Sequence, residues 1–305
     1  MAAGTRPLTA AALAVAAVAL VSAQEPVFRA AVDTVRLDVS VTRGTQPVRG
    51  LTASHFEVRD NGVVQTVDRV SLAEVPLQLL LVLDTSSSVT GDRLDALLDA
   101  ARGLVGALRP SDHVGLITFS QSARVSVPLT TAHHEVTDAL SRVTPAGATA
   151  WRDALFVGLH LFDPAIDARP VVLLFTDGED TASWTEAADV AETVRRSGAV
   201  LHAVGFTTTG RAFTRDNHNR RIGELAPSRS LQAAVDAGGG RLWSAETPAG
   251  LRALFVSALN ELRARYLVTY SPPATPAPGW HEVRVRLKGA RGEVTARPGY
   301  FVEAP

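Results

Sequence analysis

The 305-residue sequence contains no cysteine, so disulfide bridges, thiolate catalysis and cysteine-ligated zinc are excluded. It also lacks an excess of either charge, since 30 Lys and Arg residues stand against 31 Asp and Glu residues. Without a basic face, nucleic acid is not an expected partner. Apolar residues make up 46% of the chain, enough to bury a core. The length suggests one medium domain with a smaller one, or two domains.

Sequence signatures of common enzymes are absent as well. There is no G-x-S-x-G, no H-E-x-x-H, no G-x-x-x-x-G-K-[ST] and no G-x-G-x-x-G. The chain is therefore expected not to be an enzyme.

The N-terminus resembles a secretory signal. Arg6 supplies a positive charge, Leu8 to Leu20 is an almost unbroken Ala/Val/Leu run, and Val21-Ser22-Ala23 offers a cleavage site. We predict a signal peptide at 1–23 and export to the periplasm or the extracellular space. The alternative is an uncleaved anchor helix. No later segment is long and apolar enough to cross a bilayer, so no membrane span is expected in the mature chain.

Two flanking segments, 24–74 and 266–305, show the alternating hydrophobicity of half-buried strands. Val35, Leu37, Val39 and Val41 alternate with polar residues, and the same pattern returns after the central region. Asp60-Asn61-Gly62 predicts a tight turn. Isolated hairpins are marginally stable, so we expect the two flanks to pack together as one small β module.

The central segment, 75–265, alternates between strand and helix patterns. It begins with a continuous apolar run, Leu79 to Leu83, which indicates a strand buried on both faces. Such alternation predicts an α/β fold with a doubly wound, mostly parallel sheet. The polar segment 207–230 is interpreted as a surface loop. Trp151, Trp184 and two further tryptophans are scattered, and we interpret them as core or interface residues.

Oxygen-bearing side chains follow two of the predicted buried strands. Asp84, Ser86 and Ser88 come directly after the first strand, and Asp177 follows another. Parallel strands open their carboxyl ends at one sheet edge, where ligands bind. Hard oxygen donors suit Mg²⁺, Mn²⁺ or Ca²⁺. The alternative is that Asp84, Ser86 and Ser88 bind no metal and only cap the helix that follows.

This pattern resembles the metal ion-dependent adhesion site of von Willebrand factor A (vWA) domains. Asp84-x-Ser86-x-Ser88 is similar to the family's D-x-S-x-S, Gly147-Ala148-Thr149 to its threonine loop, and Thr176-Asp177-Gly178 to its second aspartate loop. The resemblance implies a Rossmann-like vWA domain at 75–265 and a divalent metal, Mg²⁺ first, held by Asp84, Ser86, Ser88, Thr149 and Asp177. Asp153, Glu179 and Asp180 are interpreted as groups that surround the metal ligands without binding the metal directly. Asp153 is the best candidate among them to orient a ligand.

The flanks resemble those of exported vWA-related proteins of the acidobacterial type. The similar segments are Gly50-Leu51-Thr52, His55 to Val58, Asp60-Asn61-Gly62 and Arg297 to Phe301.

The resemblance implies an adhesion or scaffolding module. Neutral hydroxyl ligands leave the metal much of its charge, and an open position would then capture an Asp or Glu carboxylate of a partner protein. Two alternatives stay open. One is a hydrolase that uses the metal to activate water, with Asp153 or Glu179 as base. The other is a structural envelope protein that binds through its β module.

Overall fold

The structure is a computed structural model of the chain. It describes residues 34–44, 46–72, 75–176, 180–206, 229–245, 247–272 and 277–302. The predicted signal peptide at 1–23 lies outside the described residues, as do Asp177 and most of the predicted loop at 207–230. None of the helices within these ranges has the length and hydrophobicity needed to cross a membrane.

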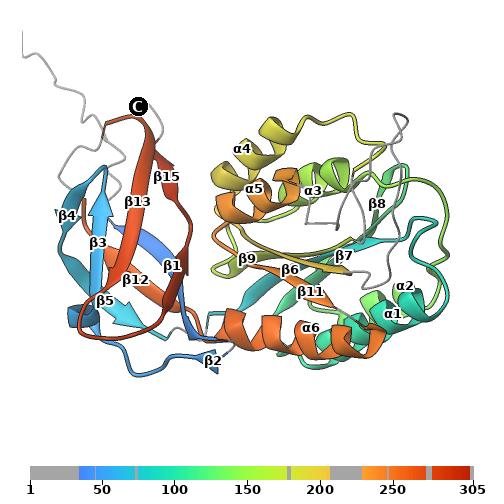
Figure 1. Cartoon of the computed structure of the whole chain (residues 1–305), viewed down its shortest axis with the longest axis horizontal. Helices are drawn as coiled ribbons and strands as arrows, with labels where there is room; N and C mark the ends of the chain where they lie inside the picture. Colours follow the sequence, from blue (N-terminus) through green and yellow to red (C-terminus); the bar gives the residue numbers. More distant parts are fainter. Residues whose placement is uncertain are drawn as a thin grey trace, which may run out of the picture. The chain divides into compact units, whose positions relative to one another are not determined.

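A six-stranded sheet lies at the centre of the α/β region (Figure 1). Its strand order is β11-β10-β9-β6-β7-β8, and every neighbouring pair is parallel except β7 with β8. The predicted doubly wound, mostly parallel sheet is therefore confirmed. The strands are β6 (Leu77–Asp84), β7 (His113–Phe119), β8 (Ala123–Thr130), β9 (Arg169–Phe175), β10 (Val200–Phe206) and β11 (Leu242–Ala245).

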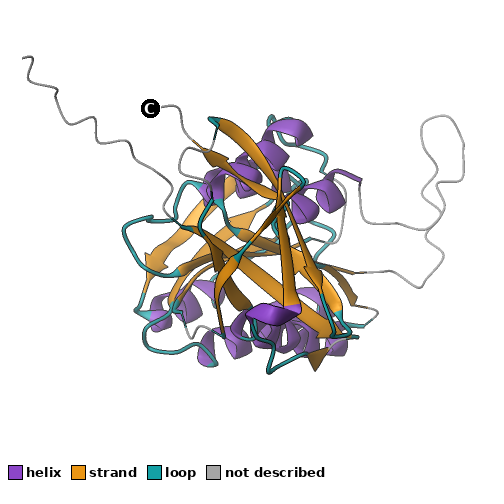
Figure 2. Cartoon of the chain, turned by 90° about the vertical axis from the view of Figure 1, so that its left-hand side faces the viewer, coloured by secondary structure: helices purple, strands orange, loops and turns teal. Residues whose placement is uncertain are grey.

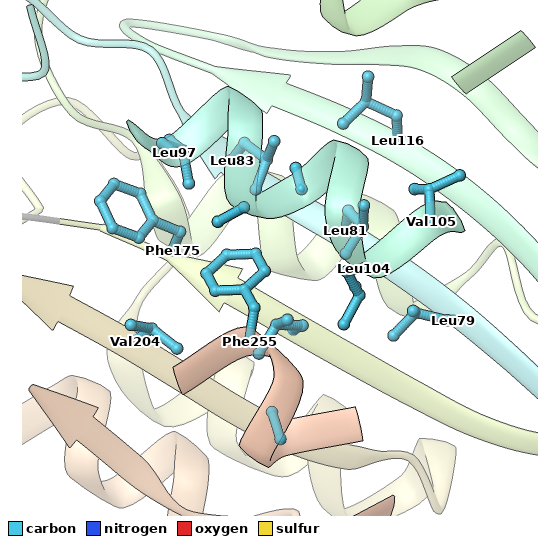
Figure 3. Packing of buried hydrophobic residues seen from close by; sticks show 14 of the residues in the cluster. Leu79, Leu81, Leu83, Leu97, Leu104, Val105, Leu116, Phe175, Val204 and Phe255 are labelled. Atoms are coloured by element: carbon cyan, nitrogen blue, oxygen red, sulfur yellow. The ribbon is translucent and has the colours of Figure 1, made fainter. Parts of the chain in front are cut away.

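Helices cover both faces of this sheet, as Figures 1 and 2 show. On one face, Leu79, Leu81 and Leu83 of β6 pack against helices α1 and α6 (Figure 3). On the other face, Leu80 and Val82 pack against α3, α4 and α5. All eight residues of β6 are buried because successive side chains point to opposite, covered faces. The helices are α1 (Asp92–Gly106), α2 (His133–Leu140), α3 (Trp151–Leu159), α4 (Ala187–Ser197), α5 (Arg229–Ala237) and α6 (Pro248–Arg263).

Helix α5 was not expected from the sequence. The predicted loop at 207–230 runs into its first turn, so that boundary was wrong. Leu231, Ala234 and Val235 have the spacing of a buried helical stripe and are buried in the structure. This stripe did not lead to a helix prediction because it covers only one helical turn before the glycines at 238–240.

The flanks form two antiparallel sheets with a shared core, which confirms the predicted β module. N-terminal β1 pairs with C-terminal β12 and β14, and N-terminal β3 pairs with C-terminal β13. A short 3-10 turn, Ala53–His55, also interrupts the N-terminal flank, where no helix was expected. The strands are β1 (Val35–Arg43), β2 (Gln46–Pro47), β3 (Phe56–Asp60), β4 (Val63–Gln65), β5 (Val67–Ser71), β12 (Tyr266–Tyr270), β13 (Gly279–Leu287), β14 (Glu293–Ala296) and β15 (Gly299–Val302).

A buried carboxylate joins the two flanks inside this module. Asp60 is 5% exposed, and its Oδ2 accepts hydrogen bonds from the hydroxyls of Tyr270 and Tyr300, both at 2.8 Å. The Nδ1–H of His281 donates to Oδ1 at 2.9 Å. Burial, together with the hydrogen bond to Asp60, raises the pKa of Tyr300 to about 12 and raises the pKa of Tyr270.

Arg265, between the end of α6 and the start of β12, contacts both the β module and the α/β region. Its side chain is fully buried, and Nη2 donates to the carbonyl oxygens of Asp38 and Gly239, each at 3.0 Å. Burial lowers the pKa of Arg265 to about 10, so the guanidinium is still charged at neutral pH. One fixed cation thereby holds β1 against the turn that follows α5.

Replacing Asp60 by Ala should destabilise the protein by about 3 kcal/mol, because three buried donors lose their shared acceptor. Urea unfolding followed by circular dichroism measures this loss. Asp68→Ala is the matched control, since the Asp68 carboxylate is exposed and accepts one bond from Ser271. The control should change stability by no more than about 0.5 kcal/mol. Equal effects of the two substitutions would contradict the role given to Asp60.

The raised tyrosine pKa values also predict an alkaline limit. The folded protein keeps the Tyr300 phenol neutral, so its contribution to stability is complete below the ordinary pKa of 10.0 and is lost as pH rises toward about 12. Tyrosinate absorbance should show Tyr270 and Tyr300, two of the three tyrosines, ionising above that ordinary value. Tyr300→Phe should remove one late-titrating group. Titration of both phenols at 10.0 in the folded protein would refute the assignment.

Candidate metal centre

Asp84 lies at the end of β6 and is fully buried. Its Oδ1 accepts a hydrogen bond from the backbone N–H of Ser86, and its Oδ2 accepts one from the hydroxyl of Thr176, both at 2.8 Å. Thr176 directly follows β9, the parallel neighbour of β6. The carboxylate is therefore fixed from two adjacent strand ends, at the sheet edge where the sequence predicted a site.

Ser86 and Ser88 place their hydroxyl oxygens 2.9 Å apart. Ser86 is buried at 1% exposure, whereas Ser88 is exposed. Adjacent oxygens around Mg²⁺ lie about 3 Å apart when the metal–oxygen bonds are about 2.1 Å and meet at right angles. The spacing of these two oxygens thus fits neighbouring ligands of one such ion.

The loop that carries Thr149 is bound to the Asp84 loop through backbone hydrogen bonds. The N–H of Ala146 donates to the carbonyl of Thr85 at 2.8 Å, and the N–H of Ser87 donates to the carbonyl of Gly147 at 3.0 Å. Gly147 has a φ of +82°, which side chains other than glycine rarely adopt. Thr149 itself is 6% exposed. The structure thus brings Asp84, Ser86 and Ser88 together and sets the Thr149 loop against them.

Asp177, the fifth predicted ligand, lies outside the described residues, and so does Glu179. Thr176, the residue before Asp177, is described. It is 2% exposed, and its N–H donates to the carbonyl of Val204 at 3.1 Å. The strand end that leads to Asp177 is therefore at the same edge as Asp84, while the ligand role of Asp177 stays a prediction.

Thr176 was missed when the sequence was interpreted, although its hydroxyl supports Asp84. A hydroxyl residue between a buried strand and an expected ligand was the available signal. Its partner is 92 residues away in the chain, so no local pattern could reveal the contact.

A second segment, 180–185, runs beside Thr149. The N–H groups of Thr181 and Ala182 both donate to the carbonyl of Thr149, at 2.8 and 3.1 Å. Burial acts to raise the pKa of Asp180, but hydrogen bonds from Ser183 and Arg152 outweigh it and hold the pKa below its usual value. Asp180 is thus an ionised group that holds the segment.

Asp153, in the first turn of α3, binds the same segment. Its Oδ1 accepts hydrogen bonds from the N–H and the hydroxyl of Thr185, at 2.9 and 2.6 Å, and its Oδ2 accepts one from the N–H of Trp184 at 3.1 Å. In the described ranges this carboxylate positions backbone. Trp184, interpreted from sequence as a core or interface residue, is 92% exposed, whereas Trp151 is fully buried as expected.

Most of the candidate metal ligands are hydroxyl groups of serine and threonine. Within the described residues, no group of three or more His, Cys, Asp or Glu side chains is placed to hold a metal. An ion bound here would depend on serine and threonine oxygens together with carboxylates. That is the hard-oxygen chemistry of Mg²⁺, Mn²⁺ and Ca²⁺.

A doubly wound α/β fold with Asp84, two serines and the Thr149 loop at the carboxyl edge of its sheet defines the class of protein. A model of the von Willebrand factor type A domain matches residues 78–235, just over half of the chain. The chain belongs to this family.

The chain is also similar to several known proteins. UPF0353 proteins of Mycobacterium leprae and Mycobacterium tuberculosis are each 26% identical to the chain over 202 and 204 residues, respectively. Each match covers 60% of this chain and 60% of the relative's length. A von Willebrand factor type A structure from Catenulispora acidiphila has a TM-score of 0.51 at 14% identity, covering 88% of this chain and 72% of its own.

Proximal thread matrix protein 1 from the mussel byssus, solved with a zinc-occupied MIDAS motif, has a TM-score of 0.52 at 17% identity. The match covers 67% of this chain and 50% of the mussel chain. At these identities the two solved structures support the fold alone.

Gly147→Ala should destabilise the protein by about 1–2 kcal/mol, since alanine resists the left-handed conformation. Gly106→Ala is the control, because Gly106 lies at the end of α1 with open space around its Cβ position. That change should be neutral or slightly stabilising. Thermal and urea unfolding of both variants check the difference, and a Gly147→Ala protein as stable as the parent would contradict the strain argument.

Proposed function

We propose that the chain binds a divalent cation, Mg²⁺ first with Mn²⁺ or Ca²⁺ as alternatives, through Asp84, Ser86, Ser88, Thr149 and Asp177. The bound ion would capture an Asp or Glu carboxylate of a partner protein, outside the cytoplasm as the N-terminal pattern predicts. The observation that carries the proposal is the 2.9 Å spacing of the Ser86 and Ser88 oxygens beside the buried Asp84 carboxylate.

The choice of ligands supports binding of an external acid. Serine and threonine hydroxyls are neutral donors, so the ion would keep much of its positive charge. When bound, the cation supplies a coordination position for an oxygen ligand from outside. The residues of this chain hold the ion and leave Ser88 at the surface, where a partner can approach.

Positive side chains next to the site favour an acidic partner. A pocket of about 380 Å³ beside the Asp84 loop is lined by Thr85, Arg124 and Arg142 among others. Both arginines are exposed, and neither has an acidic side-chain partner in the described part of the chain. Their charge would attract a negatively charged segment toward the ion.

A binding role fits the surroundings better than hydrolysis. A hydrolase would need a general base within reach of a metal-activated water. Asp153, one of the two candidates named from sequence, directs both carboxylate oxygens at the 184–185 backbone. Glu179, the other candidate, lies outside the described residues, and we propose that the protein is not an enzyme.

The test is a calorimetric titration of Mg²⁺ or Mn²⁺ into the purified chain and its serine variants. Ser86→Ala and Ser88→Ala should each weaken metal binding by about 10- to 100-fold, because each removes one oxygen ligand. Ser87→Ala is the matched control, because the side chain of Ser87 is exposed and its backbone bond to Gly147 survives the change. It should bind as the parent does.

Equal metal affinity in all four proteins, or no binding by the parent, would refute the proposal. Partner capture is tested in the same way. Peptides with an Asp or Glu should bind the parent only with the metal, and chelator or Asp84→Ala should abolish the binding.

A further inference from the structure

Trp184 is 92% exposed, the highest value among the large apolar side chains exposed in the described residues. Hydrogen bonds fix both of its neighbours in the chain. Ser183 donates to Asp180 from its N–H and its hydroxyl, and Thr185 donates to Asp153 from the same two groups. The backbone N–H of Trp184 is itself bonded to Asp153. A rigid segment thus presents an indole to solvent.

The position of Trp184 relative to the candidate metal centre follows from the same bonds. Ala182, two residues earlier, donates to the carbonyl of Thr149, one of the predicted ligands. Two residues of extended chain span at most about 7 Å, so the Trp184 backbone lies within that distance of Ala182. The backbone of Trp184 therefore lies near the loop that carries Thr149.

Helix α3, whose Asp153 binds the backbone of Trp184, carries two more exposed apolar side chains. Phe156 and Val157 are 38% and 39% exposed. They stand three and four residues after Asp153, on the helix face that Asp153 shares, and Asp153 binds the backbone of Trp184. We call Trp184, Phe156 and Val157 the rim patch.

We propose that the rim patch is a second contact for the partner and that Trp184 is its main anchor. The ligand is then a protein segment in which the metal-binding Asp or Glu has a bulky apolar side chain a few residues away. This inference rests on the proposed function. Burying an exposed, preorganised tryptophan gives binding energy at little entropic cost, which is why tryptophan dominates many interfaces.

The experiment uses the full chain with Mg²⁺ and an array of hexapeptides that are acetylated at the N-terminus and amidated at the C-terminus. Each peptide has one Asp and no other charge, and the neighbours of that Asp are varied between apolar, aromatic and small polar residues. The parent should prefer peptides with an aromatic or large aliphatic neighbour by about 10-fold or more. Trp184→Ala should bind all Asp peptides alike, and Trp184→Phe should retain part of the preference.

Val256→Ala is the matched control. Val256 is 43% exposed on α6, which covers the opposite face of the sheet, so this variant should behave as the parent does. Tryptophan fluorescence adds a direct measurement, since quenching by acrylamide reports mainly Trp184 and should fall when a preferred peptide binds.

The outcomes separate the two proposals. Mg²⁺-dependent binding whose neighbour preference is the same in the parent and in Trp184→Ala overturns the rim patch and leaves the metal site standing. Failure of every Asp peptide to bind in Mg²⁺ overturns both. Loss of the preference in Trp184→Ala with unchanged Mg²⁺ affinity supports the anchor role.

Discussion

Two backbone hydrogen bonds between the Asp84 loop and the Thr149 loop are the constraint on which the candidate centre depends. Ala146 bonds to Thr85, and Ser87 bonds to Gly147. Polar backbone groups near a protein core must find partners, and here each loop supplies the partners of the other. The loops that carry the candidate ligands Ser86, Ser88 and Thr149 are thus placed by main-chain bonds. Gly147, whose carbonyl accepts one of the two bonds, adopts a left-handed conformation.

The fold supplies those loops through its central strand. Every side chain of β6 is buried, and strands β7 and β9 flank it in parallel register. The apolar run Leu79 to Leu83 was sufficient to predict this strand, and Asp84 follows it at the expected edge. The local sequence pattern was enough to predict this strand, because a strand that is buried on both faces has a continuous run of apolar residues.

Long-range contacts were harder to predict. The alternation of Val35 to Val41 indicated strands, and the marginal stability of isolated hairpins indicated that the flanks pair, which the structure confirms. Nothing local showed that Asp60 accepts hydrogen bonds from Tyr270 and Tyr300, residues more than 200 positions away. The role of Thr176 and the existence of helix α5 were not predicted for related reasons. A single hydroxyl residue and an apolar stripe of one helical turn give little pattern in a sequence.

The carboxylate of Asp153 positions the segment that carries Trp184. Three hydrogen bonds bind it to the chain at 184–185, one of them from the backbone N–H of Trp184. The side chain of Trp184 itself is 92% exposed. Metal ligands of serine, threonine and aspartate would recognise any accessible acid, so selectivity among partners must come from residues around them. Near the candidate site the chain offers the exposed Trp184 and, beside Thr85, Arg124 and Arg142, which have no acidic side-chain partner in the described part of the chain. Affinity for the carboxylate and choice of partner would therefore reside in different residues.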